Sequence, residues 1–334
     1  MKKYFFLASV AVVALSSCSN EEISEVSVLP GTGATPIEFT AYSGRATRYS
    51  ASEANIESLV YQNGSGYGGF SLTGTYLAND KNEFIMDNSL YTVDLESDQK
   101  VCSPVSEQAP MWTDAIPTDA QVSFYAYYPS GAAQTTSPVT LSTTDGTLTI
   151  SNVDGETDVM AAAATVTKGA AVALEFKHLL AQVVMNVRYD EDYADLLGGV
   201  SEVVLNNLTL TAPVTSVYDL AEGVATGPEA VVDGGGNTSR YIFISSGISV
   251  YSESNGFGTA MIPASNDGTE CPLSISFTFS TRNQQSYTYT KSANVTIVAG
   301  CKNVINITLK GDSPISITAS VGAWEDAEDQ NINF

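Results

Sequence analysis

The sequence has few basic residues, a single histidine and little charge of any kind. Lysine and arginine together number 14 against 37 aspartates and glutamates, which gives a net charge of −23 over 334 residues. Such an acidic surface repels nucleic acid and anionic membranes, so neither is expected as a partner. With 43% hydrophobic and only 15% charged residues, the chain is nevertheless expected to be globular rather than disordered.

The scarcity of catalytic side chains limits the chemistry that the chain can perform. His178 lies within an apolar stretch with no nucleophile motif beside it, so we interpret it as a core histidine. The carboxylates are scattered through turns and match neither a glycosidase pair nor a calcium loop. No cysteine or histidine spacing predicts a metal site, and the glycine cluster at 63–69 lacks the lysine of a phosphate loop. We therefore predict a protein that is not an enzyme and uses no cofactor.

Long apolar runs are missing except at the N-terminus. Residues 4–15 form an apolar run that is too short to span a bilayer and that follows two lysines. The run ends in Leu-Ser-Ser before Cys18, which resembles the lipobox of bacterial lipoproteins. We predict a signal peptide at residues 1–17 and a lipid such as palmitate on Cys18 as the membrane anchor, with an ordinary signal peptide cut elsewhere as the alternative. Loss of the two lysines leaves 12 basic against 37 acidic residues, a net charge of −25.

Only four cysteines are present, and lipidation of the first would leave Cys102, Cys271 and Cys301. An exported protein is permitted disulfides. Cys271 and Cys301 each open a predicted strand and could form a disulfide if those strands pair, which would leave Cys102 as the odd thiol. The alternative is three unpaired and mostly buried thiols.

Short segments of alternating apolar and polar residues recur along the chain, separated by turn residues. This spacing predicts an all-β sandwich rather than alternating β-α units. The aromatic segment 121–129 carries apolar residues on both faces, which is typical of a central strand. Residues 172–188 read as two strands or one long bent strand, and residues 189–197 as a short acidic helix. A linker at 167–170 divides the predicted N-terminal domain, 49–168, from a C-terminal domain, 169–334.

One segment, residues 36–48, combines a predicted strand with a site for proteolysis. Ile37, Phe39 and Ala41 alternate with polar residues, as in a strand with one face against a core. A Ser-Gly turn and two arginines, Arg45 and Arg48, follow in a small polar stretch that is easily cut. Loss of the strand would leave a groove of unpaired backbone groups that could accept another strand. The alternative is an ordinary first strand followed by ordinary loop charges.

The C-terminal region has a similar pattern. Ile315, Ile317, Ala319 and Val321 alternate on one face of a predicted last strand. This strand is the candidate to be donated to a second molecule. The alternative is a closing strand with a frayed tail.

Taken in order, these motifs resemble the fimbrillin-like proteins, which are subunits of type V pili of Bacteroidetes. The resemblance rests on the lipobox, residues 37–39 with 45–48, residues 123–129, residues 174–183, and residues 315–321 with Trp324. An acidic stretch after Cys18, residues 19–22, is similar to the surface-export signal of Bacteroidetes lipoproteins.

The resemblance implies two tandem transthyretin-like β-sandwich domains of Greek-key topology. It also implies export to the outer membrane as a lipoprotein, removal of a propeptide, 18–48, by an arginine-specific protease, and assembly with other pilus subunits into a fimbria by strand exchange. Arg48 is the expected cut site and Arg45 the second choice.

Adhesion through a host or bacterial surface receptor would follow from membership of a pilus. Two alternatives stay open at this point. The chain could be an uncleaved anchor subunit, or a monomeric surface lipoprotein that binds glycan or a host protein through exposed tyrosines at 65–76.

Overall fold

The computed structural model describes residues 34–43, 58–62, 68–105, 108–130, 138–151, 153–196, 199–226, 238–310 and 316–323. Within these ranges the regular secondary structure is β-strand, apart from one short α-helix, α1 (Glu191–Leu196), and a 3₁₀ turn at Ser58 and Leu59. The predicted all-β class is therefore confirmed, and the predicted short acidic helix is present.

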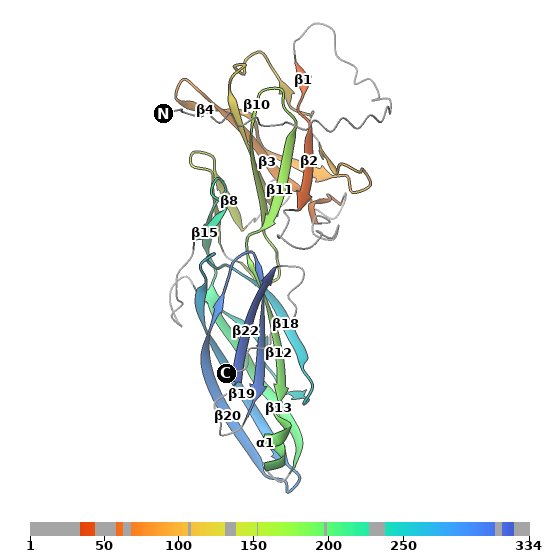
Figure 1. The fold of residues 1–334 in the computed structure, drawn as a ribbon, viewed down its shortest axis with the longest axis vertical. Coiled ribbons are helices and arrows are strands. Elements are labelled where there is room, and N and C mark those ends of the chain that lie inside the picture. Colours follow the sequence, from red (N-terminus) through yellow and green to blue (C-terminus); the bar gives the residue numbers. More distant parts are fainter. Residues whose placement is uncertain are drawn as a thin grey trace, which may run out of the picture. The chain divides into compact units, whose positions relative to one another are not determined.

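Seven strands from the first part of the chain form a sheet that closes on itself. We refer to it as the closed sheet. Figure 1 shows β2 beside β11, the two neighbours in this sheet that lie farthest apart in the sequence. In order around the closed sheet, the strands are β10 (Met160–Thr167), β11 (Val172–His178), β2 (Phe39–Ser43), β5 (Val101–Pro104), β4 (Lys81–Val93), β3 (Phe70–Ala78) and β7 (Gln121–Tyr128), which pairs again with β10.

The strand β7 shows how the sequence pattern produces this sheet. Val122, Phe124 and Ala126 alternate along β7 and are completely buried in the core of the closed sheet. Tyr127, on the opposite face, is also buried, in a second core cluster. The strand pairs with β3 on one side and β10 on the other. The prediction of a central strand with apolar residues on both faces is confirmed.

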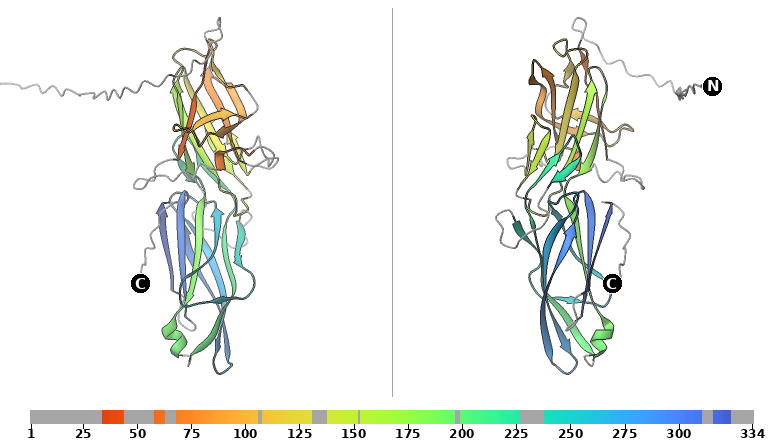
Figure 2. Two further views of the ribbon diagram at one scale, coloured as in Figure 1. Left: turned by 90° about the vertical axis from the view of Figure 1, so that its right-hand side faces the viewer. Right: turned by 60° about the vertical axis from the view of Figure 1, so that its left-hand side comes forward.

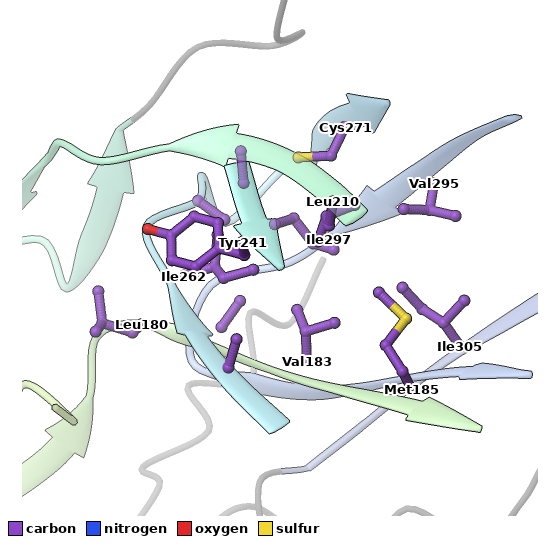
Figure 3. Close-up of a cluster of buried hydrophobic side chains, with 14 of the residues drawn as sticks. Leu180, Val183, Met185, Leu210, Tyr241, Ile262, Cys271, Val295, Ile297 and Ile305 are labelled. Carbon is purple, nitrogen blue, oxygen red and sulfur yellow. The ribbon is translucent and has the colours of Figure 1, made fainter. Parts of the chain in front are cut away.

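Two further sheets are built from the second part of the chain, and their side chains share one core. Figure 3 shows Val183 and Met185 from one sheet close to Leu210 and Val295 from the other. The first sheet has the order β18 (Asn255–Ile262), β12 (Ala181–Tyr189), β21 (Cys301–Leu309) and β22 (Ser316–Ala323). The second has the order β16 (Thr238–Ile244), β13 (Val200–Pro213), β19 (Thr269–Thr281) and β20 (Ser286–Ile297), and β17 (Ile248–Val250) also pairs with β13.

A small fourth sheet combines strands from both parts of the chain. Its order is β15 (Val224–Thr226), β14 (Ser216–Asp219), β9 (Thr147–Ile150) and β8 (Val139–Ser142). Leu148 of β9 lies opposite Tyr218 of β14, and both are buried in the same cluster as the core of the two larger sheets. This shared sheet joins the two predicted domains through backbone hydrogen bonds.

The chain leaves the closed sheet between His178 and Ala181, later than the predicted domain boundary after Lys168. The reason is that β11 completes the closed sheet by pairing with β10 and β2. The segment 172–188 is therefore two strands that belong to different sheets. Residues 34–334 form one compact unit, and their division into two transthyretin-like domains stays a prediction.

The predicted strand of Ile37, Phe39 and Ala41 begins later than expected, because β2 starts at Phe39. The preceding β1 (Thr35–Pro36) pairs instead with β6 (Met111–Trp112). The two strands are separated at Ile37 and Glu38, where the backbone changes from pairing with β6 to pairing with β11 and β5. At this point the N–H of Ile37 still donates to the carbonyl of Pro110, next to β6, at 2.9 Å.

We predict that Phe39→Ala lowers the free energy of unfolding of the uncut chain by about 3–5 kcal/mol, because it empties a filled core position. Urea unfolding at constant slope measures this change. The control is Glu38→Gln, whose side chain is exposed and whose substitution is expected to cost under about 0.5 kcal/mol. Equal losses in the two variants would contradict the prediction.

Candidate functional site

The slot occupied by β2 is the candidate site, and the backbone holds β2 on both sides. With β11 the pairing is parallel and runs from Phe39 opposite Val172 to Ser43 opposite Phe176. With β5 it is antiparallel, with Phe39 opposite Cys102. In the hydrogen bonds that flank these ladders, the Val172 N–H donates to the Glu38 carbonyl at 2.9 Å and the Ala41 N–H to the Lys100 carbonyl at 3.0 Å. Without β2, the closed sheet would have two open edges.

The inward face of the segment is wholly apolar. Ile37, Phe39 and Ala41 are 4%, 2% and 1% exposed, so the predicted buried face is confirmed. The ring of Phe39 packs edge-on against Tyr91, with centroids 5.6 Å apart, and against Phe124 at 5.1 Å. Burial of a side chain such as Phe39 contributes about 1.5–3 kcal/mol.

Removal of β2 would therefore create a groove with a defined chemistry. Its two rims would be the unpaired backbone groups of β11 and β5, and its floor would include the apolar side chains that contact Phe39. Open strand edges of this kind accept an extended chain, because backbone hydrogen bonds hold it and side-chain pockets select it.

Cys102 is part of this site, although no sequence pattern indicated that it would be. It is buried and lies directly opposite Phe39 in the antiparallel pair of β5 and β2. Burial raises the pKa of the Cys102 thiol to about 12. The thiol therefore stays protonated and unreactive while β2 is in place. No local pattern could have revealed this, because the pairing of β5 with β2 is long-range.

The last strand, β22, lies at the edge of its sheet. Among the described strands it pairs with β21 only, and both views in Figure 2 show this last blue strand at the border of the sheet. Ile317 lies opposite Ile307, and Ala319 lies opposite Ile305. Val321 is 47% exposed. Ile315 lies outside the described residues, and the donation of this strand stays a prediction.

The predicted processing sites also lie outside the described residues. Arg45 and Arg48 follow the end of β2 at Ser43 in the sequence, and Cys18 precedes the first described residue. Within the described part of the chain, no helix has the length and apolar character needed to cross a membrane.

The possible disulfide between Cys271 and Cys301 is not formed. Cys271 lies in β19 opposite Val295, whereas Cys301 lies in β21 opposite Ala323, and these strands belong to different sheets. The condition for the disulfide, pairing of the two strands, is therefore not met. All three described cysteines are free thiols: Cys102 and Cys271 are buried and Cys301 is half-buried.

The remaining candidate residues are His178 and the tyrosines of the segment 65–76. His178 contacts a carboxylate, with its Nδ1 2.7 Å from Oδ2 of Asp158, and both side chains are largely buried. This pair lies where the chain leaves the closed sheet. Tyr76, in the segment proposed for glycan binding, is half-buried against the core of the closed sheet. Residues 65–67 of that segment lie outside the described residues, as do parts of other loops, and no group of metal-binding side chains occurs among the residues that are described.

We predict that a thiol reagent at pH 8 modifies Cys301 first in the native chain expressed from residue 19. Cys102 and Cys271 both have a pKa raised to about 12 by burial, so only about one in ten thousand of either thiol is ionised at that pH. Peptide mapping after timed labelling identifies the modified residue. Cys301→Ser should abolish the early reaction, and early labelling of Cys102 would show that β2 does not shield it.

Two solved structures have a similar fold. A crystal structure of a fimbrial protein from Bacteroides vulgatus aligns with a TM-score of 0.58 and 15% identity, over 86% of this chain and 99% of that one. A candidate cell adhesion protein from Parabacteroides distasonis aligns with a TM-score of 0.51 and 13% identity, over 88% of this chain and 98% of that one. At such low identity, these alignments establish likeness of fold.

The family is identified by comparison of the sequence with family models. No curated protein sequence matches the chain significantly. A family model described as fimbrillin-like, however, matches residues 69–324, from just before β3 to just after β22. The match covers well over half of the chain, and the chain therefore belongs to the fimbrillin-like family.

Proposed function

We propose that this chain is a structural subunit of a type V pilus that matures by losing β2 and polymerises by accepting a strand from another subunit. It is exported as a lipoprotein on Cys18, reaches the outer membrane and is cut after Arg48, or after Arg45 as the second choice. The product enters a fimbria at the cell surface and serves adhesion to a host or bacterial receptor. Its role is structural rather than catalytic, and it requires no cofactor.

The observation that carries the proposal is the position of β2. This strand has only five residues, yet it is paired on both sides and closes a seven-stranded sheet. Its apolar face fills the core next to Phe124 and Tyr91. Two arginines follow it closely in the sequence. Family membership and the fold shared with a fimbrial protein support the same assignment.

Cleavage after the arginine would change how β2 is held rather than which contacts it makes. While the chain is intact, β2 is tethered and returns to its slot at a high effective concentration. After a cut the segment is a separate peptide, and its loss from the groove becomes irreversible on dilution. Cleavage therefore commits the subunit to assembly.

A strand from another subunit can replace the backbone hydrogen bonds and the buried apolar side chains of β2. Each backbone hydrogen bond that it makes adds about 0.5–1.5 kcal/mol net. Each apolar side chain that it buries adds about 1.5–3 kcal/mol, before the ordering cost is subtracted. The last strand, β22, supports this step because it has only one described neighbour and can leave its sheet by breaking one ladder.

We predict that Arg45→Lys with Arg48→Lys stops fibre formation and leaves the monomer folded. The double variant keeps both positive charges but removes the side chain that an arginine-specific protease recognises. Electron microscopy of the cell surface and denaturing gels of sheared material measure the effect. Arg240→Lys, at an exposed position in β16, is the matched control and should polymerise like the parent chain.

The N-terminus of the sheared protein separates the possible outcomes. Mass spectrometry should find Tyr49 or Ala46 as the first residue of the parent subunit. A lipidated Cys18 at the start of the parent chain would indicate an anchor subunit or a monomeric surface binder instead. Normal fibres in the double variant would remove cleavage from the proposal.

A further inference from the structure

The segment at residues 108–116, which we call the flap, lies against one end of the closed sheet. It contains β6, and the side chains of Trp112 and Ile116 are both 3% exposed within the core of the closed sheet. Among the described strands, β6 pairs with β1 alone, and Trp112 lies opposite Thr35. In Figure 1, β1 lies beyond the start of β2, at the upper end of this sheet. The flap is therefore held by residues of the predicted propeptide, 18–48.

The backbone of the propeptide contacts the flap over three consecutive residues, 35–37, which we call the clip. The pairing of β1 with β6 is extended by one residue, because the N–H of Ile37 donates to the carbonyl of Pro110 at 2.9 Å. The next element of the propeptide, β2, pairs instead with β11 and β5. The propeptide therefore holds two separate elements in place. The clip holds the flap, and β2 closes the sheet.

The propeptide also contributes side chains to the core around Trp112. The Trp112 ring packs edge-on against Phe124, with ring centroids 6.2 Å apart. Phe39 of β2 packs against the same Phe124 ring at 5.1 Å, and Ile37 is buried in the same core. Loss of the propeptide would remove both of these side chains together with the backbone partner of β6. Because close packing holds core side chains in place, Trp112 would then be held less firmly.

The other end of the flap is held by residues that remain after cleavage. The Nζ of Lys168, in the turn between β10 and β11, donates to the carbonyl of Ile116 at 2.8 Å. The N–H of Ile116 donates to the carbonyl of Thr113 at 3.2 Å. Neither bond involves the propeptide. Loss of the clip would therefore free residues 110–112, while the flap stays attached at Ile116.

We propose that the clip holds the flap closed, and that loss of the propeptide releases residues 110–112 and exposes Trp112 at the end of the closed sheet. This inference rests on the proposed function, in which the propeptide is removed, and it adds a second element that maturation changes. The released β6 presents unpaired backbone groups beside an aromatic side chain. The immature and the mature subunit thus differ in surface at the flap as well as at the slot of β2.

A substitution in the clip tests this coupling in the uncut chain, expressed from residue 19. Thr35→Pro removes the backbone N–H of an exposed residue in β1, and proline cannot complete a ladder. Thr35→Ala is the matched control, because it removes the same side chain and keeps the N–H. Hydrogen exchange with mass spectrometry compares the amides of the flap with those of residues 173–177 in β11, which report on the presence of β2.

We expect the amides of the flap to exchange at least about threefold faster in Thr35→Pro than in Thr35→Ala, because the clip is weakened. The amides of β11 should exchange at equal rates in the two variants, since β2 stays in its slot. Equal exchange of the flap in the two variants would overturn the inference.

The same comparison is made after cleavage, with peptides of the propeptide. Trp324→Phe leaves Trp112 as the only tryptophan of the chain. This chain, expressed from residue 19, is cut with an arginine-specific protease and separated from the released segment. Its flap and its β11 should both exchange faster than before the cut, and the emission of Trp112 should shift to longer wavelength.

Peptides of residues 34–43 that carry Thr35→Ala or Thr35→Pro are then added at concentrations that restore slow exchange in β11. Both peptides contain β2, but only the Thr35→Ala peptide contains an intact clip. The flap should therefore exchange at least about threefold faster with the Thr35→Pro peptide than with the Thr35→Ala peptide. Equal protection of the flap by the two peptides would contradict the role of the clip.

The amides of β11 separate failure of this inference from failure of the proposed function. If β11 exchanges faster after the cut while the flap stays protected and the emission of Trp112 is unchanged, the slot opens without the flap, and the inference alone fails. If β11 stays protected after the cut, β2 does not leave its slot. The proposed function then fails, and the inference fails with it.

Discussion

The closed sheet depends on β2, a strand of five residues that pairs with β11 on one side and with β5 on the other. A sheet without edges has no unpaired backbone groups to recruit another chain. Here that protection comes from one short strand near the N-terminal end of the described chain. In the proposed function, the same contacts that complete the fold also prevent assembly for as long as they persist.

The other sheets are organised differently. They remain open at their borders, and β22 lies at one such border with a single described neighbour. Among the described strands, β2 is therefore paired on both sides, whereas β22 is one of several strands that pair on one side only. In the proposed exchange, the ladder of eight residue pairs between β22 and β21 is replaced by two ladders in the groove, where β2 makes five pairs with β11 and two with β5.

The His178–Asp158 pair and the thiols lie in different parts of the fold. His178 and Asp158 pair at the point where the chain leaves the closed sheet, and the small sheet of β8, β9, β14 and β15 crosses between the two parts of the chain. Cys271 is enclosed in the shared core of the two larger sheets (Figure 3), whereas Cys102 lies in the core of the closed sheet, opposite Phe39 of β2. The two thiols have similarly raised pKa values but differ in what would expose them.

The sequence alone determined which residues of each strand are buried. Apolar and polar residues alternate at Ile37, Phe39 and Ala41 and along β7. This alternation predicted which side chains are buried, and the structure buries them. It also determined the all-β class and the family, because strand spacing and ordered motifs are local properties of the chain.

The tertiary structure decided which strands pair. Backbone hydrogen bonds are nearly independent of side-chain identity, so a local pattern reports burial but not the partner. This is why the parallel pairing of β2 with β11, the break before Phe39, the place of Cys102 opposite Phe39 and the separation of Cys271 from Cys301 appeared only in the folded chain. The place where the chain changes sheet, after His178, also depends on long-range pairing, since β11 pairs with β2, far from it in the sequence.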